Sequence, residues 1–222
     1  MHLAHAARAA LPPTPSPLLI AGSVGPYGAY LANGSEYTGA YTLSPSDFQA
    51  FHRGRIAALL DAGADLLACE TLPSYGEITA LADLLATEFP TTESFFAFTV
   101  SPSNPSAIAD GTPLSTVLQA LEPHANIVAV GVNCVSPELA LEGLKEMKKH
   151  TQKPLVVYPN SGEKWDAGAR QWGGSKSQGG ELRRWVGEVW EVGARVVGGC
   201  CRTGPAEIGV IAGVVEERNE KL

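Results

Sequence analysis

The sequence predicts an α/β protein built on a parallel sheet that helices cover. Six short runs are apolar throughout and do not alternate with polar residues, which is typical of strands buried on both faces. A longer segment with helical spacing of apolar residues follows each run in turn. No change in composition interrupts these six strand–helix units along the 222 residues, so we expect one domain.

The first strand is expected within residues 17–26, and a loop rich in Gly and Tyr follows it to about residue 43. Ser44 then has the chemistry of an N-cap, and Pro45 suits the first helical position. Asp47 completes a capping-box pattern, and Gly63 is a suitable C-terminal stop. These signals predict a helix over most of residues 45–62.

The second strand is expected at residues 65–73, and the helix after it opens with Ser74 and Glu77 as a second capping box. Ser136 and Pro137 open another helix in the same way. The remaining predicted strands are 95–100, 126–134, 154–160 and 194–201, and the remaining predicted helices lie around 114–122, 180–192 and 205–218. A long Gly-rich connection at 161–180 separates the fifth strand from its helix.

Residues 1–17 predict a short alanine-rich helix and a proline-rich connector before the sheet-forming domain of residues 18–222. They contain no continuous apolar stretch of the kind found in a secretory signal. Nothing in the chain approaches the roughly 20 apolar residues of a membrane span. A net charge of −7 without a basic stripe argues against nucleic acid or an anionic membrane as partner. We expect a cytoplasmic protein.

Three cysteines follow the ends of two predicted strands. Cys134 ends the fourth strand, and Cys200 and Cys201 end the sixth. The carboxyl ends of the strands of a βα barrel meet on one face, where three thiolates would suit Zn²⁺ and leave one coordination position open. Buried cysteines are also common as small apolar side chains, so metal binding and packing both remain open on spacing alone.

Cys69 and Glu70 end the second predicted strand. Because successive side chains alternate between the faces of a strand, the two residues point in opposite directions. We expect Cys69 in the core and Glu70 in the site, where a carboxylate could bind an ammonium group. The alternative is that Glu70 serves as an anion at the start of the next helix.

The motifs "GVNC", "YPNSGE" and "GGCCRTGP", preceded by "FHRGRIAALLDAGADLLACETLP", resemble the homocysteine S-methyltransferase family over roughly residues 18–215. With Arg202 directly after the double cysteine, the last motif is similar to that of the branch that uses S-methylmethionine or S-adenosylmethionine. The resemblance implies a (β/α)8 TIM-barrel type of fold and a methyltransferase activity. It implies zinc ligation by Cys134, Cys200 and Cys201 and contact of Glu70 with the homocysteine amino group. It also places Asn133, Asn160 and Ser161 near the substrate pocket.

The implied reaction transfers a methyl group from a sulfonium donor to homocysteine and gives methionine, with zinc as the cofactor. The metal favours the thiolate form of homocysteine, which then attacks the methyl group. Trp165 and Trp172, in the segment 161–180, either attract the cationic donor or pin this loop to the rim of the barrel.

The chain departs from the family pattern in one respect. Only six strand–helix units are visible where the family has eight, and the Asp-Gly-Gly motif that ends the family's first strand is absent. Incomplete closure would expose strand edges, so we expect self-association through them. The alternative function is a truncated, inactive remnant that binds zinc and homocysteine. A thiol redox protein is disfavoured because the adjacent pair Cys200 and Cys201 is not a C-x-x-C motif.

Overall fold

The main sheet has six parallel strands that follow one another in chain order. The computed structural model describes residues 1–14, 17–166, 171–174, 176–177 and 179–220. The order across the sheet is β1-β2-β3-β6-β7-β10, and each pairing is parallel. The strands are β1 (Ala21–Val24), β2 (Leu66–Leu72), β3 (Ser94–Phe98), β6 (Ile127–Asn133), β7 (Leu155–Tyr158) and β10 (Ala194–Val197). An order without reversal is that of a βα barrel, whereas a doubly wound sheet reverses.

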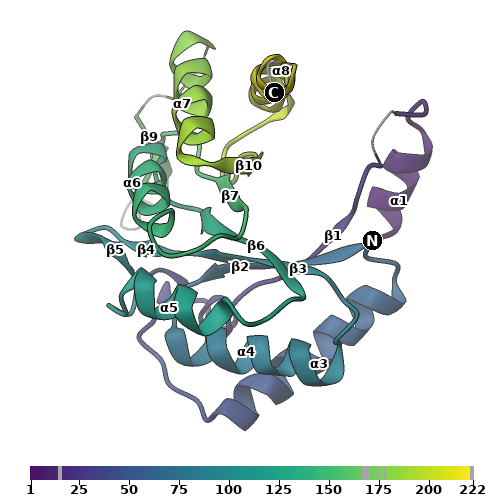
Figure 1. Ribbon diagram of the computed structural model, residues 1–222, viewed down its shortest axis with the longest axis vertical. Helices are drawn as coiled ribbons and strands as arrows, with labels where there is room; N and C mark the ends of the chain where they lie inside the picture. Colours follow the sequence, from purple (N-terminus) through teal and green to yellow (C-terminus); the bar gives the residue numbers. More distant parts are fainter. Residues whose placement is uncertain (15–16, 167–170, 175, 178, 221–222) are drawn as a thin grey trace.

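The helices that follow these strands form one continuous row. Each contacts the next from α3 to α8, and Figure 1 shows the row passing from α3, α4 and α5 beneath the sheet to α6, α7 and α8 beside β7 and β10. The helices are α3 (Pro45–Asp61), α4 (Tyr75–Glu88), α5 (Leu114–Leu121), α6 (Pro137–Met147), α7 (Gly179–Val192) and α8 (Pro205–Asn219). Such a row corresponds to the outer layer of a barrel, and the barrel-type α/β prediction is confirmed.

The sheet curls without closing. β1 pairs only with β2 and β10 only with β7 among the described residues. The curl brings Tyr158 of β7 across the inner face to Glu70 of β2, where its hydroxyl donates to Oε2 at 2.9 Å. A groove of about 330 Å³ remains on this inner face, lined by residues that include Ser23, Glu70, Phe95, Tyr158 and Val196.

The two edges of the sheet carry exposed apolar side chains. Leu19, just before β1, is 62% exposed, and Val196 in β10 is 50% exposed. Unpaired edges with apolar groups are a template for association with another chain. Self-association stays a prediction, and the exposed apolar side chains at the two edges give it a structural basis.

Short elements occur where the sequence predicted only loops. β4 (Val100–Ser101) pairs antiparallel with β5 (Asn104–Ile108), and β8 (Lys164–Asp166) pairs with β9 (Gln171–Gly173) within the Gly-rich connection. The loop after β1 contains α2 (Tyr27–Tyr30) and the 3₁₀ turn η1 (Ser35–Tyr37). Runs of two to five residues are too short to give a periodic signal.

The expected N-terminal helix is present as α1 (His2–Ala9). It buries no residue and is attached by polar contacts, in which Arg8 binds Asp65 at 2.5 Å and the ring of His5 contacts the carbonyl of Ala62. No helix in the described part of the chain combines the length and the apolar character that crossing a membrane requires.

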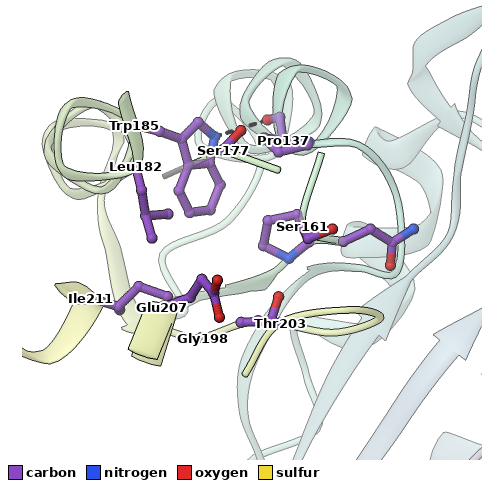
Figure 2. Close-up of a pocket in the computed structure, with 12 residues that line it drawn as sticks. Pro137, Ser161, Ser177, Leu182, Trp185, Gly198, Thr203, Glu207 and Ile211 are labelled. Carbon is purple, nitrogen blue, oxygen red and sulfur yellow. Dashed lines mark hydrogen bonds between the residues drawn. The ribbon is translucent and has the colours of Figure 1, made fainter. Parts of the chain in front are cut away.

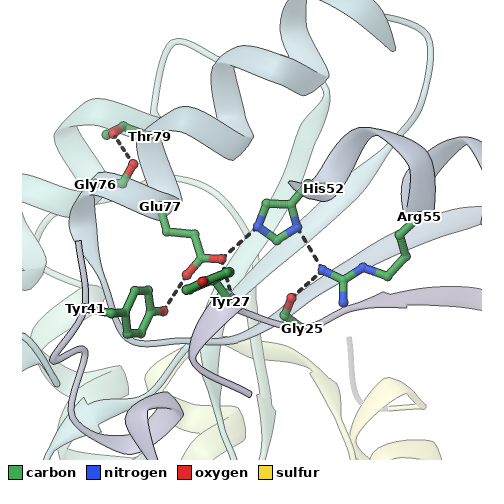
Figure 3. A network of polar contacts seen from close by, with 8 residues as sticks. All are labelled: Gly25, Tyr27, Tyr41, His52, Arg55, Gly76, Glu77 and Thr79. Atoms are coloured by element: carbon green, nitrogen blue, oxygen red, sulfur yellow. Dashed lines mark hydrogen bonds and ion pairs between the residues drawn. The ribbon is translucent and has the colours of Figure 1, made fainter. Parts of the chain in front are cut away.

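The N-cap predictions were right at Ser44 and Ser136 and wrong at Ser74, and Asp47 accepts from the Ser44 hydroxyl without closing the predicted capping box. Ser44 and Ser136 each accept a hydrogen bond from a first-turn backbone N–H, and a proline follows each of them. Ser74 makes no such bond, and Glu77 does not reach back to it. The carboxylate of Glu77 is fully buried and is engaged by the loop after β1 and by α3 instead (Figure 3).

Candidate metal and substrate site

Cys134, Cys200 and Cys201 form a thiol cluster at the carboxyl edge of the sheet. The Sγ atom of Cys134 lies 3.1 Å from that of Cys200 and 3.7 Å from that of Cys201. All three sulfurs lie within 4.8 Å of one another. Zn–S bonds of about 2.3 Å in a tetrahedron place neighbouring sulfurs about 3.8 Å apart. The donor set therefore fits a zinc ion with three thiolates and a fourth position for another ligand.

The segment 158–161, which begins at the last residue of β7, holds the cluster by its backbone. It makes one main-chain hydrogen bond to each cysteine: Cys134 N–H to Tyr158 O at 3.2 Å, Cys200 N–H to Pro159 O at 2.8 Å, and Ser161 N–H to Cys201 O at 3.0 Å. Since β7 lies between β6 and β10, its end can reach both cysteine-bearing loops. The backbone of the "YPNS" motif thus fixes the two loops that carry the cysteines.

Strained backbone is concentrated beside the cluster. Cys134 has a φ of 58°, Thr71 of 60° and Arg202 of 68°, all in the left-handed region that costs a non-glycine residue about 1–3 kcal/mol. Asn133 stabilises one of these turns, because its amide accepts from Thr71 N–H and donates to Thr71 Oγ1, both at 2.8 Å. Asn133 is 1% exposed, so the structure places this predicted substrate residue as a tie between β2 and β6.

Gly199 is required by space. A Cβ atom there would lie 2.2 Å from the side chain of Thr203, closer than any real contact. Neither Gly198 nor Gly199 has a positive φ. The turn to the two cysteines is tight because residue 199 lacks a side chain.

Glu70 is held in the inner groove by two hydroxyls. Ser23 Oγ donates to Oε1 at 2.5 Å, and Tyr158 donates to Oε2. Burial and then the nearby Glu70 carboxylate raise the pKa of Tyr158, and the Cys200 thiol adds to the rise. Tyr158 therefore contacts Glu70 through its hydroxyl and Cys134 of the thiol cluster through its backbone carbonyl. Glu70 faces the inner groove, while Cys69 lies in the core with no exposed surface.

Close contact among the three thiols shifts their pKa values in different directions. Hydrogen bonds from Cys134 and Cys200 lower the pKa of Cys201, whereas the contacts with Cys134 and Cys201 raise the pKa of Cys200. A cysteine binds a metal as its thiolate.

Asn160 and Ser161, both predicted near the pocket, lie beside the cluster. Asn160 donates from Nδ2 to the carbonyl of Cys134 at 3.2 Å. Ser161 donates from Oγ to Glu163 at 3.0 Å, and Arg202 also binds Glu163. The structure brings both residues to the two loops that carry the cysteines.

Two cavities of different size adjoin the site. The smaller, shown in Figure 2, has about 20 Å³ of space among Ser161, Ser177, Thr203 and Glu207, which is room for one water molecule and not for a substrate. The larger has about 700 Å³ and is lined by residues that include Glu36, Tyr37, Thr99 and Cys134. The side chains of Trp165 and Trp172 lie outside the part of the structure that is described.

Tyr37 is a site residue that the sequence prediction missed. Its hydroxyl lies 3.9 Å from Cys134 Sγ, and burial, followed by the Cys134 thiol, raises its pKa. The only signal in the sequence was the abundance of Tyr and Gly in the loop after the first strand.

The fold and the thiol cluster define a class of protein: barrel-type α/β proteins with a three-cysteine site able to hold a metal at the carboxyl ends of the strands. The family model described as homocysteine S-methyltransferase matches residues 1–215. The chain belongs to the homocysteine S-methyltransferase family.

Individual relatives agree with this assignment. The chain is 49% identical over 199 residues to "Homocysteine S-methyltransferase" of Escherichia coli, and 46% identical over 201 residues to "Homocysteine S-methyltransferase YbgG" of Bacillus subtilis. It is 43% identical over 195 residues to "Selenocysteine methyltransferase" of Astragalus bisulcatus. The metallated crystal form of the Escherichia coli homocysteine methyltransferase MmuM superimposes with a TM-score of 0.82, at 46% identity and over 96% of this chain.

These matches cover nearly all of this chain but only part of the relatives. The matched region is 90%, 89% and 86% of this chain and 63%, 61% and 57% of the three relatives, and 66% of the MmuM chain. The chain therefore spans about three fifths of their length.

Proposed function

We propose that this protein transfers a methyl group from a sulfonium donor, S-methylmethionine or S-adenosylmethionine, to homocysteine in a zinc-dependent reaction. The observation that carries the proposal is the thiol cluster, in which three sulfur atoms lie within 4.8 Å of one another and Cys134 lines the larger cavity. Membership of the family supports homocysteine as the acceptor.

Each residue of the site has a distinct part in the proposed reaction. Cys134, Cys200 and Cys201 hold the metal, which when bound lowers the pKa of a coordinated thiol so that it is a thiolate at neutral pH. Glu70 binds the homocysteine ammonium group from the groove, while Ser23 and Tyr158 fix the orientation of its carboxylate.

The transfer itself is a direct displacement. The homocysteine thiol gives its proton to solvent, and its sulfur attacks the methyl carbon of the donor. A new S–C bond forms as the bond from that carbon to the sulfonium sulfur breaks. The electron pair stays on the donor sulfur, which leaves as a neutral thioether, and the methylated acceptor is methionine. In-line geometry requires acceptor and donor to approach the reacting carbon from opposite sides.

A second candidate function is binding of zinc and homocysteine without turnover. The open groove favours it, because Glu70 is half-buried on a face that the sheet does not close. An ion pair gains less where water screens it.

Methionine formation tests the proposal. We expect the zinc-loaded chain, given homocysteine and S-methylmethionine with a deuterated methyl group, to release deuterated methionine, which mass spectrometry detects. Glu70→Gln should weaken homocysteine binding by about 2–5 kcal/mol and leave zinc bound. Glu142→Gln, an exposed change on α6, serves as the control. Homocysteine binding without labelled methionine would refute the first function in favour of the second.

A further inference from the structure

Arg202 belongs to the double-cysteine motif, but the proposed reaction gives its side chain no part. It directly follows Cys201 and forms an ion pair with Glu163, 39 positions earlier in the chain. Its Nε lies 3.2 Å from Oε2 of Glu163, and its Nη2 lies 3.3 Å from Oε1. This arrangement matches the fork of a guanidinium to both oxygens of a carboxylate. The pair thereby joins the "GGCCRTGP" motif to the "YPNSGE" motif.

The turn that carries the two adjacent cysteines has a backbone conformation that needs support. Thr203 N–H donates to the carbonyl of Cys200 at 3.2 Å and closes a tight turn over residues 200–203. Within this turn Arg202 has a φ of 68°, in the left-handed region that residues with a side chain rarely adopt. A non-glycine residue stays in this region when the surrounding structure holds it there. The ion pair with Glu163 is one such support.

Glu163 is itself fixed to the segment that holds the cysteine backbone. Its side chain is 11% exposed and accepts from Ser161 Oγ at 3.0 Å, and its own N–H donates to that oxygen at 3.4 Å. Ser161 is buried and donates from its backbone to the carbonyl of Cys201. Three consecutive residues, Cys200, Cys201 and Arg202, are therefore tied to the same segment after β7.

We propose that Arg202 and Glu163 are positioning residues of the metal site. Their ion pair acts as a latch that holds the turn with the sulfurs of Cys200 and Cys201 directed toward Cys134. A turn that is ordered before the metal arrives loses less conformational freedom on binding, so the latch raises the affinity for zinc. The inference rests on zinc binding by the thiol cluster, which is part of the proposed function, and does not depend on methyl transfer.

The latch is charged and partly open to solvent. The guanidinium of Arg202 holds the pKa of the Glu163 carboxyl below its usual value, so the pair is ionised at neutral pH. The side chain of Arg202 is 49% exposed, and dissolved salt screens exposed charges. Zinc affinity should therefore fall more steeply with added salt in the wild-type chain than in a variant without the latch.

Competition for zinc between the protein and a chromophoric chelator tests the inference. Arg202→Gln removes the charge and keeps a non-glycine residue at this φ. It should weaken zinc binding about threefold to tenfold, between the effect of an exposed ion pair and that of a buried partner of a metal ligand. Glu163→Gln should have a similar effect. Because both changes remove the same contact, the double variant should bind zinc no more weakly than the weaker single variant.

Two further variants separate the latch from a general effect of charge. Arg202→Lys should keep part of the affinity, since lysine retains the charge but lacks the planar fork. Arg53→Gln is the matched control, because Arg53 binds Glu88 through the same two nitrogens, at 2.6 Å and 2.7 Å, but joins α3 to α4. Zinc affinity and its salt dependence should be unchanged in this control. Without zinc, Arg202→Gln should unfold at the same urea concentration as the wild type, since an exposed pair adds little to the stability of the fold.

Several results would overturn the inference. They are a zinc affinity of Arg202→Gln within about twofold of the wild type, effects of the two single changes that add in the double variant, and an equal salt dependence with and without the latch. Unfolding of zinc-free Arg202→Gln at a much lower urea concentration would also overturn it, because the pair would then support the fold as a whole.

The outcomes also separate this inference from the proposed function. If the wild-type chain binds no zinc, both are wrong. If Arg202→Gln retains the wild-type zinc affinity while methionine is formed, the latch is wrong and the proposed function stands. If Arg202→Gln weakens zinc binding but no methyl group reaches homocysteine in the wild type, the latch stands and the proposed function is wrong.

Discussion

Replacing Glu77 with Gln should lower the free energy of unfolding by about 3–5 kcal/mol. The Glu77 carboxylate is fully buried and accepts from three donors: Tyr27 N–H at 2.6 Å, Tyr41 O–H at 2.5 Å and His52 Nε2 at 2.8 Å (Figure 3). An amide has one oxygen in place of two, and its NH₂ group would face at least one of these donors. Each buried donor left unpaired costs about 1–3 kcal/mol, and the charged hydrogen bonds are lost as well.

The geometry of His52 strengthens this expectation. Its Nδ1 lies 2.9 Å from Nη2 of Arg55, which can only donate, so Nδ1 accepts and Nε2 carries the proton given to Glu77. Arg55 in turn donates to the carbonyl of Gly25 at 2.7 Å. Loss of the carboxylate would therefore disturb a chain of contacts between α3, α4 and the loop after β1, which carries Tyr37 to the thiol cluster.

Urea denaturation followed by circular dichroism measures the effect. Glu88→Gln is the matched control, because Glu88 also lies on α4 but its bond to Arg53 is exposed, and such a pair contributes little. If Glu77→Gln fails to fold, Tyr41→Phe tests the same network. It removes one donor and leaves the charge, so we expect an intermediate loss of unfolding free energy. A Glu77→Gln protein within about 1 kcal/mol of the wild type would refute the reasoning, since the network would then add no more than an exposed pair.

Two further predictions concern the metal and the edges of the sheet. The purified chain should bind about one zinc ion. Cys134→Ser should abolish zinc binding, and Cys69→Ser should leave it in place. Elemental analysis measures the zinc content, and zinc retained by Cys134→Ser would contradict the assignment. The chain should also self-associate, and Val196→Lys should raise its monomer fraction in light scattering because charge protects a strand edge, whereas Leu11→Lys, away from β10, should not. A wild-type chain that is monodisperse and monomeric would show that the open edges are tolerated.

The sheet and the thiol cluster could be predicted from the sequence because both depend on local patterns. Each strand is an uninterrupted apolar run, and the parallel topology by itself brings the ends of β6 and β10 to one edge. The motifs identified the three cysteines before any geometry was known. The direction of the Glu70 side chain also follows from a local pattern, since alternation along β2 places it on the face opposite Cys69.

The buried polar contacts could not be predicted, because they join residues far apart in the chain. Ser74 and Glu77 have the spacing of a capping box, but the carboxylate is more fully satisfied by Tyr27, Tyr41 and His52, up to 50 positions away. The spacing identifies Glu77 as a hydrogen-bond acceptor but does not show which donors the fold brings to it.

The two halves of the site depend on the sheet to different degrees. The thiol cluster is held by β6, β7 and β10, which are direct neighbours, so its geometry needs no further strand. Glu70 of β2 is held by Ser23 of β1 and Tyr158 of β7. β1 is the direct neighbour of β2, whereas β7 lies three strands away, so the orientation of Glu70 depends on how tightly the sheet bends. A change in curvature would move Glu70 relative to the sulfurs and leave the sulfurs in place. Zinc affinity should therefore be insensitive to opening of the sheet, whereas homocysteine affinity should fall with it.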